Sequence, residues 1–321
     1  MVSSKTTALN ADALEFLRKA RESARLPFQE MAPEEARKLY ESSCCMTAFS
    51  VTELAQTQDL SVATAQHAVP IRIYRPMRSA PGGSPAILYI HGGGWVLGSI
   101  STHDAICHML ATSVDAVVVA VDYRLAPDYP FPAGFNDVLA AYHFVCHNAT
   151  ELGIDPTRVA LAGDSAGGAL AASLALALRT EVDVPPIAQV LFYPVTDIST
   201  ESQGYERVQD GSILTAQTMR WFRDHYAPRS LDRHDWRASP MKAQSLHGAA
   251  PALIITAAHD PLCEEGGAYA ERLERDGVPT THVHLEDQMH AFLTMGGIIP
   301  SARVPFDYAV QFLRQRLFPS E

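Results

Sequence analysis

The sequence predicts an α/β fold built on a mostly parallel sheet, and three observations support this class. Short, continuously apolar segments recur along the chain, as in residues 86–90, 116–121 and 252–258. Strands that are apolar on both faces are typical of a sheet covered on both sides by helices. Helix-forming segments such as residues 169–179 alternate with them. A length of 321 residues suits one large domain with an insertion.

Composition and charge exclude several classes of function. Hydrophobic residues make up 47% of the chain and charged residues 19%, as in ordinary soluble globular proteins. A net charge of −11, with no cluster of Lys and Arg, argues against a nucleic-acid partner. No apolar run is long enough for a membrane span, and residues 1–24 lack the apolar core of a signal peptide. We therefore expect a cytoplasmic protein without membrane insertion.

Cysteine and histidine usage gives no metal or disulfide pattern. The odd number of scattered cysteines fits a reducing compartment, and the 13 histidines show no metal-ligand spacing. The adjacent pair Cys44 and Cys45 could form a metal or redox site, but packing of a helix is the favoured interpretation. We expect no metal and no cofactor. The five cysteines are Cys44, Cys45, Cys107, Cys146 and Cys263.

Two helices are expected before the first strand. Residues 10–24 carry an apolar stripe behind the helix-capping Asn10, and Pro33 with the acids after it begins a second helix. Helices in this position are expected to cover the domain as a cap. Four large side chains near them could line a pocket or only seal the helices onto the domain, namely Phe28, Met31, Tyr40 and Met46.

A glycine-rich loop follows the first buried strand. Residues 64–67 and 71–74 are expected to form an antiparallel hairpin before this strand. Three glycines without side chains let a backbone approach a ligand closely, with N–H groups free to donate. We assign the amides of Gly93 and Gly94 to an oxyanion hole, with Gly92 supporting the loop.

The residues on either side of these glycines have supporting roles. His91 could be a catalytic base, but we expect it to hold the loop by hydrogen bonds, with Trp95 packed beneath. The next strand leads into a proline-rich loop. We expect Asp122, Arg124 and Asp128 in this loop to pair with one another, and Asp137 in the following helix to anchor it.

A serine lies between a predicted strand and a predicted helix. Ser165 is the centre of a Gly-x-Ser-x-Gly pattern after the apolar residues 158–162. Gly163 and Gly167 remove side chains that would collide with a strained turn, which lifts the serine hydroxyl above the sheet. The amide of Ala166, in the first turn of the helix, would be the third oxyanion donor.

The alternation of predicted strands and helices stops between residues 198 and 246 and then resumes. This polar and aromatic stretch contains an expected amphipathic helix at residues 215–226 and lies where a lid belongs. We therefore divide the chain into N-terminal cap helices (1–50), the first part of the catalytic domain (51–197), a cap insertion (198–246) and the second part of the catalytic domain (247–321).

A serine nucleophile needs a base, and the base needs an acid partner. In a parallel sheet these groups lie at the carboxyl ends of strands. Asp260 follows the strand at residues 252–258, and His290 lies in the loop after the strand at residues 280–285. Both are favoured over less well placed candidates, which are His259, His282, His284, Glu286 and Asp287.

Taken together, these motifs resemble the bacterial hormone-sensitive-lipase-like esterases (family IV carboxylesterases), from about residue 70 to the end. The stretches that carry the resemblance are His91-Gly92-Gly93-Gly94-Trp95, Tyr123-Arg124-Leu125-Ala126-Pro127, Gly163-Asp164-Ser165-Ala166-Gly167-Gly168, Asp260-Pro261-Leu262 and His290-Ala291-Phe292. The resemblance implies an α/β-hydrolase fold with a mostly parallel, eight-stranded sheet and an N-terminal cap. It also implies a triad of Ser165, Asp260 and His290 with oxyanion donors at Gly93, Gly94 and Ala166.

Two positions depart from the pattern of this family. Asp128 stands where Glu is usual, and Ala291 stands where Gly is usual after the histidine, which could shift His290 slightly. The expected activity is hydrolysis of short- to medium-chain acyl esters through an acyl-enzyme, with activity rising as His290 loses its proton. The expected partner is a small-molecule ester, with a homodimer as one option for the assembly.

Three other functions are compatible with parts of the pattern. An amidase or transacylase would use the same site. A non-catalytic binding protein is a second alternative, since the plant gibberellin receptors resemble this family, but a complete triad argues against it. A lipase would need an exposed apolar lid, whereas the expected cap carries many charges, among them Glu201, Arg220 and Arg223.

Overall fold

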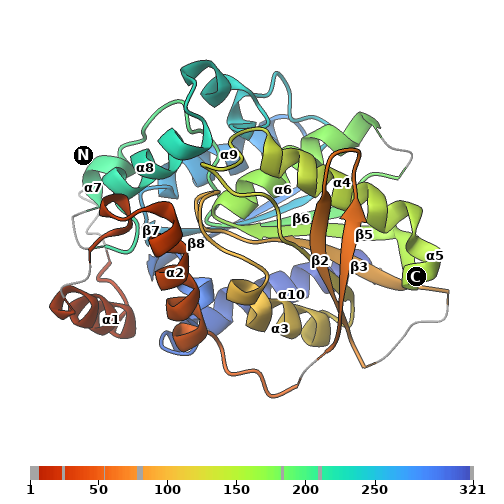
Figure 1. Ribbon diagram of the computed structural model, residues 1–321, viewed down its shortest axis with the longest axis horizontal. Helices are drawn as coiled ribbons and strands as arrows, with labels where there is room; N and C mark the ends of the chain where they lie inside the picture. The colour runs from red at the N-terminus through yellow and green to blue at the C-terminus, as the bar shows by residue number, and fades with distance from the viewer. Residues whose placement is uncertain are drawn as a thin grey trace.

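The computed structural model describes residues 7–23, 26–53, 55–77, 82–181, 184–208 and 212–318. In this part of the chain an eight-stranded sheet lies between two layers of helices (Figure 1). The strands are β1 (Gln56–Ala63), β2 (Ala68–Arg75), β3 (Ser84–Ile90), β4 (Val117–Val121), β5 (Ile154–Asp164), β6 (Ala188–Phe192), β7 (Ala252–His259) and β8 (Thr280–Met289).

Ten α-helices and several short 3₁₀ turns connect the described strands. The α-helices are α1 (Ala11–Glu22), α2 (Pro33–Thr47), α3 (Asp104–Val114), α4 (Ala133–His147), α5 (Ala149–Leu152), α6 (Ala166–Glu181), α7 (Gly204–Arg207), α8 (Ala216–Tyr226), α9 (Cys263–Arg275) and α10 (Arg303–Leu317). The 3₁₀ turns are η1 (Phe28–Glu30), η2 (Ser101–His103), η3 (Ser230–His234), η4 (Pro240–Lys242), η5 (Phe292–Met295) and η6 (Pro300–Ala302). None of the helices in the described ranges is long and apolar enough to cross a membrane.

The strands follow the order β1-β2-β4-β3-β5-β6-β7-β8 across the sheet. The β1–β2 hairpin is antiparallel, β2 runs antiparallel to β4, and all other neighbours are parallel. The parallel strands therefore bring their carboxyl ends to one edge of the sheet. The expected fold class, a mostly parallel eight-stranded sheet flanked by helices, is confirmed.

The central strands are buried along their whole length. Every residue of β3 and of β4 is buried, which explains their continuous runs of Val, Ile, Leu and Ala. Helices α4, α6 and α9 pack on one face of the sheet, and α3 and α10 pack on the other (Figure 1). Both layers bury apolar side chains against the sheet.

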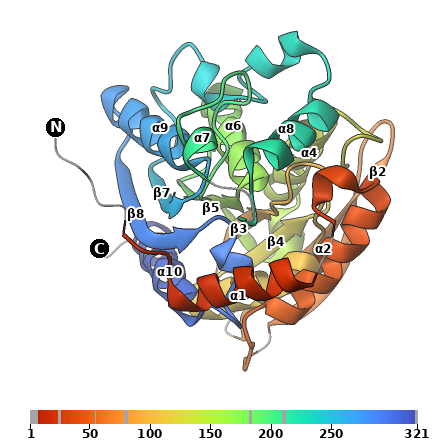
Figure 2. The ribbon, with the colours of Figure 1, turned by 90° about the vertical axis from the view of Figure 1, so that its left-hand side faces the viewer.

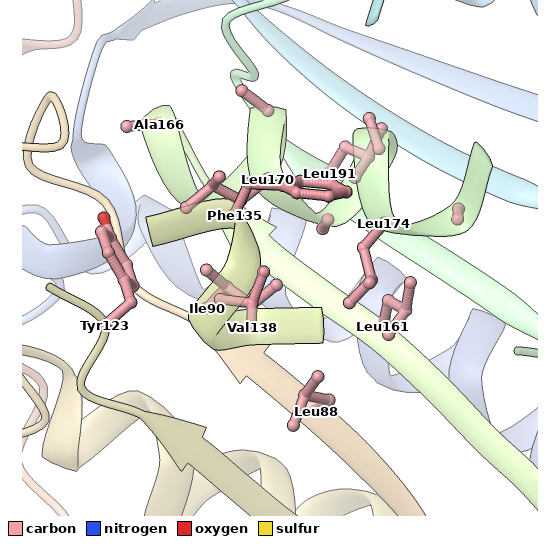
Figure 3. Close-up of a cluster of buried hydrophobic side chains, with 14 of the residues drawn as sticks. Leu88, Ile90, Tyr123, Phe135, Val138, Leu161, Ala166, Leu170, Leu174 and Leu191 are labelled. Carbon is pink, nitrogen blue, oxygen red and sulfur yellow. The ribbon is translucent and has the colours of Figure 1, made fainter. Parts of the chain in front are cut away.

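Figure 3 shows the core between the sheet and helices α4 and α6. Full burial of one such side chain stabilises the fold by about 1.5–3 kcal/mol. This layer holds the base of the turn after β5 in place, because Ala166 begins α6 and is itself part of the cluster. The labelled side chains are Leu88, Ile90, Tyr123, Phe135, Val138, Leu161, Ala166, Leu170, Leu174 and Leu191.

The structure corrects the sequence interpretation at several boundaries. Residues 64–67 are not a strand but the turn of the β1–β2 hairpin, closed by a bond from the Thr64 amide to the His67 carbonyl of 2.8 Å. The preceding strand β1 was missed because it is polar and largely exposed. Strand β8 continues to Met289, four residues beyond the expected end. Residue 24, the expected end of the first helix, lies outside the described residues.

The N-terminal helices and α8 lie at the carboxyl edge of the sheet. Figure 2 looks onto this side, with α1 and α2 in front and α8 beside them. The expected cap of α1 is present, since the Asn10 side chain accepts a bond from the Asp12 amide of 3.0 Å. In α8 the Thr215 side chain caps the first turn by accepting from the Thr218 amide. These segments surround the strand ends where the expected site residues lie.

Candidate active site

Three polar side chains from three strand ends form a hydrogen-bonded chain. The His290 Nε2 atom lies 2.9 Å from the Ser165 hydroxyl, and its Nδ1 atom lies 2.6 Å from the Asp260 carboxylate. The second carboxylate oxygen of Asp260 accepts a 2.8 Å bond from the Leu262 amide, which fixes the orientation of the acid. All three side chains are buried. The structure thus brings together the serine, acid and histidine that the sequence singled out.

The turn that carries Ser165 is strained, as the glycine pattern predicts. Ser165 has a φ of 54°, a left-handed conformation that is unfavourable for a residue with a side chain. A Cβ atom at Gly163 would overlap the Gly167 carbonyl, and one at Gly167 would overlap the Ile90 carbonyl. The Ser165 amide donates to the Phe192 carbonyl of β6 at 2.9 Å. The neighbouring strand β6 therefore helps to hold the serine in its left-handed conformation.

The glycine loop after β3 lies beside the serine. Gly93 and Gly94 have φ values of 113° and 61°, and both line a pocket together with Ser165 and His290. The Gly93 carbonyl closes the loop by accepting from the Leu97 amide at 2.8 Å. Among the described residues, none accepts a hydrogen bond from the amides of Gly93, Gly94 or Ala166. These three donors remain available to an oxyanion.

Asp164, next to the serine, ties the glycine loop to the sheet. Its Oδ1 atom accepts bonds from the Tyr89 hydroxyl at 2.9 Å and the Gly92 amide at 3.0 Å, and lies 3.1 Å from His103 Nε2. Burial by itself raises the pKa of the Asp164 carboxyl. The His103 imidazole and the bonds from His103 and Tyr89 outweigh burial and bring this pKa below its usual value. An ionised Asp164 accordingly positions Gly92.

His91 holds the loop and is not part of the triad. Its Nδ1 atom donates to the Gly92 carbonyl at 2.8 Å, and its ring stacks on Tyr123 with the centroids 4.3 Å apart. The Tyr123 hydroxyl donates to the His91 carbonyl at 3.0 Å. Burial lowers the pKa of His91 to about 3, so its ring stays neutral. Trp95 is buried beneath the loop, stacked on Tyr226 at 4.3 Å.

The alternative bases and acids have other partners. Glu286 accepts a bond from the Thr7 hydroxyl at 2.7 Å, and His259 Nε2 donates to the Thr7 carbonyl at 3.0 Å. His282 and His284 both contact the Thr256 hydroxyl, at 2.9 and 3.0 Å. Asp287 belongs to strand β8, which continues through the expected loop. In the part of the chain that the structure describes, no hydrogen bond links these side chains to His290 or Ser165.

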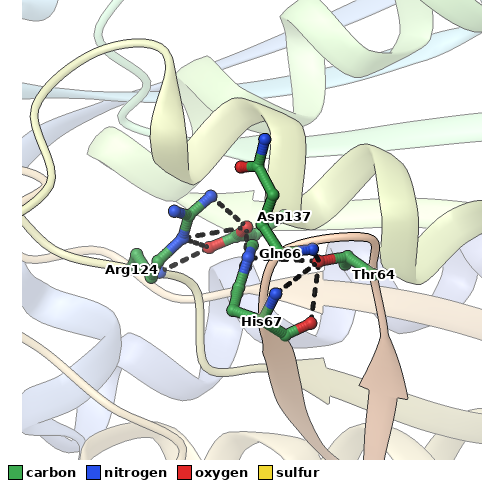
Figure 4. Close-up of polar contacts among 5 residues, drawn as sticks. All are labelled: Thr64, Gln66, His67, Arg124 and Asp137. Atoms are coloured by element: carbon green, nitrogen blue, oxygen red, sulfur yellow. Dashed lines mark hydrogen bonds and ion pairs between the residues drawn. The ribbon is translucent and has the colours of Figure 1, made fainter.

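The charged residues of the loop after β4 do not pair with one another as expected. Arg124 instead pairs with Asp137 of α4, whose carboxylate also receives the Arg124 amide at 2.9 Å and His67 Nε2 at 2.7 Å (Figure 4). Asp137 therefore anchors the loop, as expected. Asp128 pairs with Arg37 of α2 at 2.9 Å. The predicted pairing within the loop is wrong because Arg124 binds the buried Asp137 carboxylate of α4, while Asp128 binds the Arg37 guanidinium of α2.

Asp122, the third charged residue of that loop, accepts a 3.2 Å bond from the Ile100 amide.

The departure at Ala291 also has a structural explanation. Ala291 has a φ of 64°, the conformation in which the glycine of the family would be unstrained. His290 nevertheless contacts both Ser165 and Asp260. The substitution therefore leaves the hydrogen-bonded chain in place and puts the strain on the alanine backbone.

Three residues at the site were missed by the sequence analysis. His103 contacts Asp164, Tyr193 packs its ring 4.7 Å from that of His290, and Arg37 donates to the carbonyls of Val96 and Ala126 at 2.9 Å each. None of the three belongs to a motif that the sequence analysis assigned to the site. Of the four expected pocket residues, Phe28 and Tyr40 do line the pocket at Ser165.

A buried carboxyl group lies close to Asp260. Glu265 of α9 accepts a 2.7 Å bond from the Thr196 amide and a longer one from Asp197. Burial raises the pKa of Glu265 to about 8, and the nearby carboxylates of Asp197 and Asp260 act in the same direction. Glu265 is therefore mostly neutral at pH 7 and adds little negative charge beside Asp260.

The adjacent cysteines do not form a reactive pair. Cys44 is buried in α2, and burial raises its pKa to about 12, while Cys45 is exposed. Within the described ranges, no group of three or more His, Cys, Asp and Glu side chains is placed to hold a metal ion.

This sheet, with a serine on the turn after β5 and its acid and histidine after β7 and β8, defines an α/β-hydrolase. Residues 87–294 match the model of the family described as alpha/beta hydrolase fold. The chain belongs to this family. The match covers every expected triad and oxyanion residue, from Gly93 to His290.

Known esterases are similar over nearly the whole chain. An ethyl acetate hydrolase of Pseudomonas putida is 40% identical over 296 residues, covering 91% of this chain and 93% of that protein. A thermostable esterase structure from Pseudomonas putida superposes with a TM-score of 0.93 at 30% identity, covering 99% of this chain and 100% of the other. The thermophilic carboxylesterase EstE1, cloned from a metagenomic library, has a TM-score of 0.86 at 38% identity, with coverages of 90% and 99%. The expected resemblance to esterases of the hormone-sensitive-lipase type is confirmed.

Proposed function

We propose that this protein is a carboxylesterase in which Ser165 is the nucleophile, His290 the base and Asp260 the orienting acid. The main support is the hydrogen-bonded chain in which His290 lies 2.9 Å from the Ser165 hydroxyl and 2.6 Å from the Asp260 carboxylate. Neutral His290 takes the proton of Ser165, whose oxygen attacks the ester carbonyl. His290 then protonates the leaving alcohol, and water releases the acid from the acyl-enzyme.

The amides of Gly93, Gly94 and Ala166 stabilise the tetrahedral intermediate in this mechanism. Their role is supported by their position beside Ser165 and by their lack of an acceptor among the described residues. One such donor contributes on the order of 3 kcal/mol to the transition state. Gly92, Asp164 and His91 keep the loop in place, and Gly163 and Gly167 allow the turn. Asp260 accepts from the Nδ1 atom of His290 and thereby fixes its tautomer.

We also propose that residues 1–50 and 198–246 act as a cap over a catalytic domain formed by residues 51–197 and 247–321. The position of α2 and α8 at the carboxyl edge of the sheet supports this division (Figure 2).

A cytoplasmic location is supported by five cysteines that are all unpaired. A homodimer is the proposed assembly because β8 is an edge strand, and size-exclusion chromatography with light scattering tests it.

The activity is tested with p-nitrophenyl esters from acetate to palmitate. We expect the rate to peak at short to medium chains and to fall by about 10⁶-fold in Ser165→Ala. Such a result would establish an ester hydrolase and locate its nucleophile. A peak at palmitate would indicate a lipase. If the wild-type protein hydrolyses no ester, the proposed function is wrong, and amide substrates become the next test.

A further inference from the structure

The pocket at the nucleophile is small. It has a volume of about 50 Å³ and is lined by catalytic groups and by side chains of η1, α2 and α8. Sites that enclose small organic ligands measure about 300–1,000 Å³. The pocket as it stands therefore accommodates the reacting carboxyl group and little more of an ester.

A much larger groove lies on the other side of one wall of this pocket. It has a volume of about 830 Å³ and runs between α1, η1, α2 and the start of α8. Its lining is mostly apolar, and two of its large side chains are notably exposed, Leu26 at 57% and Met46 at 66%. Exposed apolar side chains gathered in a groove usually mark a binding site.

The pocket and the groove share three residues, Phe28, Ile213 and Thr218. These residues are the wall between the two spaces. The ring of Phe28 lies against Tyr40, with centroids 6.2 Å apart and planes at 72°. Since Tyr40 also lines the pocket, Phe28 stands at the boundary between Ser165 and the groove.

The wall is held together by side chains. The Thr218 hydroxyl of α8 donates to the Gln29 side chain of η1 at 2.8 Å, and Thr218 also contacts Thr215 at 3.0 Å. A longer contact of 3.5 Å joins Gln29 to Gln217. Rotation of a few side chains can therefore open the wall without breaking a backbone hydrogen bond between η1 and α8.

We propose that Phe28 is a gate residue that sets the chain-length specificity of the enzyme, and that the groove receives the apolar chain of longer esters when the gate opens. This inference rests on the proposed esterase function. The groove adjoins the catalytic pocket across the shared wall, and its apolar lining matches an alkyl chain. With the gate closed the enzyme handles short chains, and with the gate open it handles longer ones.

The test compares Phe28→Ala with the wild type on p-nitrophenyl acetate and decanoate. Removing the ring opens the wall, so the ratio of kcat/KM for decanoate to that for acetate should rise about tenfold or more. The same comparison with ethyl and decyl acetate shows whether the acyl or the alcohol chain enters the groove. The matched control is Leu14→Ala, an exposed position of α1 that does not line the groove. Its ratio should equal that of the wild type.

A second variant guards against misfolding of Phe28→Ala. Met46→Arg places a charge in the groove at an exposed position, so it should fold normally and lower the decanoate-to-acetate ratio about tenfold. Suppose that both variants are folded by circular dichroism and keep the wild-type ratio of long-chain to short-chain kcat/KM, with varied acyl chains and with varied alcohol chains. The role of Phe28 as a gate is then excluded. A wild-type protein that hydrolyses none of these esters would instead refute the esterase function itself.

Discussion

The backbone angle at Ala291 is strained at a position where the family usually has glycine, while His290 keeps its contacts with Ser165 and Asp260. Ala291 has a φ of 64° immediately after His290. For a residue with a Cβ atom this conformation costs about 1–2 kcal/mol. The contacts of His290 with Ser165 and Asp260 hold the alanine in this conformation. The strain is therefore stored in the loop that carries His290.

We predict that Ala291→Gly stabilises the protein. Glycine removes the strain but makes the unfolded chain more flexible, so the free energy of unfolding should rise by a net amount of up to about 1 kcal/mol. Urea unfolding measures the change. Ala140→Gly, within helix α4, is the matched control and should lose about 1 kcal/mol. Equal losses in both variants would contradict strain at Ala291.

At the scale of elements, the Arg37 side chain joins α2 to the glycine loop after β3. Arg37 donates to the carbonyls of Val96 and Ala126 and to the Asp128 carboxylate, each at 2.9 Å. Val96 and Ala126 belong to two different loops, which Arg37 therefore holds at a fixed separation. Because Val96 lies two residues after Gly94, its carbonyl position affects the direction of the Gly94 amide.

We predict that Arg37→Lys lowers kcat about tenfold while KM changes little. Lysine cannot reproduce the planar fork that reaches three acceptors, so the proposed oxyanion donors lose part of their alignment. Partial recovery of kcat on adding guanidinium at low concentration to Arg37→Ala would identify positioning as the cause. Lys38→Gln, one residue further along α2, should retain wild-type kinetics, because among the described residues Lys38 pairs only with the exposed Glu34. A rise in KM alone would argue for a substrate contact instead.

Helix α9 contains a carboxyl group whose protonation depends on folding. The pKa of Glu265 is raised by burial to about 8 in the folded protein, from 4.5 when exposed. A raised folded pKa means that the folded state holds this proton more tightly than the unfolded state. The stability from this group is full below about pH 4.5 and is lost as the pH rises to about 8.

We predict that Glu265→Gln removes this pH dependence. Glutamine keeps an acceptor for the Thr196 amide but cannot ionise, so the variant should gain stability over the wild type as the pH rises. The gain between pH 5 and 8 should be on the order of 3 kcal/mol. Urea unfolding at several pH values measures it. Parallel pH profiles for the two proteins would show that Glu265 ionises alike in both states.

The elements that the sequence predicted best are those whose local pattern and tertiary role agree. Strands β3 and β4 are continuous apolar runs because they are buried on both faces. Gly163 and Gly167 flank Ser165 because a Cβ atom at either position would overlap nearby backbone atoms. Strand β1 was missed because it is an exposed edge strand whose partner, not its own sequence, makes it a strand. The role of Arg37 was missed because its acceptors are backbone carbonyls, which carry no sequence pattern.

At the scale of the whole molecule, the parallel sheet gathers residues that are far apart in the chain. Ser165, Asp260 and His290 meet because β5, β7 and β8 end at the same edge. The opposite edge needs its own attachment, since the antiparallel β1–β2 hairpin has no helix crossover to hold it. The Asp137 carboxylate adds one such attachment to the pairing of β2 with β4, because it binds His67 of the hairpin and Arg124 of the loop after β4 (Figure 4).

We predict that Asp137→Ala destabilises the protein by about 3 kcal/mol. Asp137 is almost fully buried, so its loss leaves the Arg124 guanidinium and amide and the His67 ring without their acceptor. Urea unfolding measures the loss, and hydrogen exchange should show faster opening of β1 and β2 than of β5. Asp59→Ala, which removes an exposed ion pair with Arg72 in the same hairpin, should cost less than 1 kcal/mol. Equal costs for the two variants would mean that the hairpin is held by its strand pairing alone and that Asp137 has no special role in joining it to the molecule.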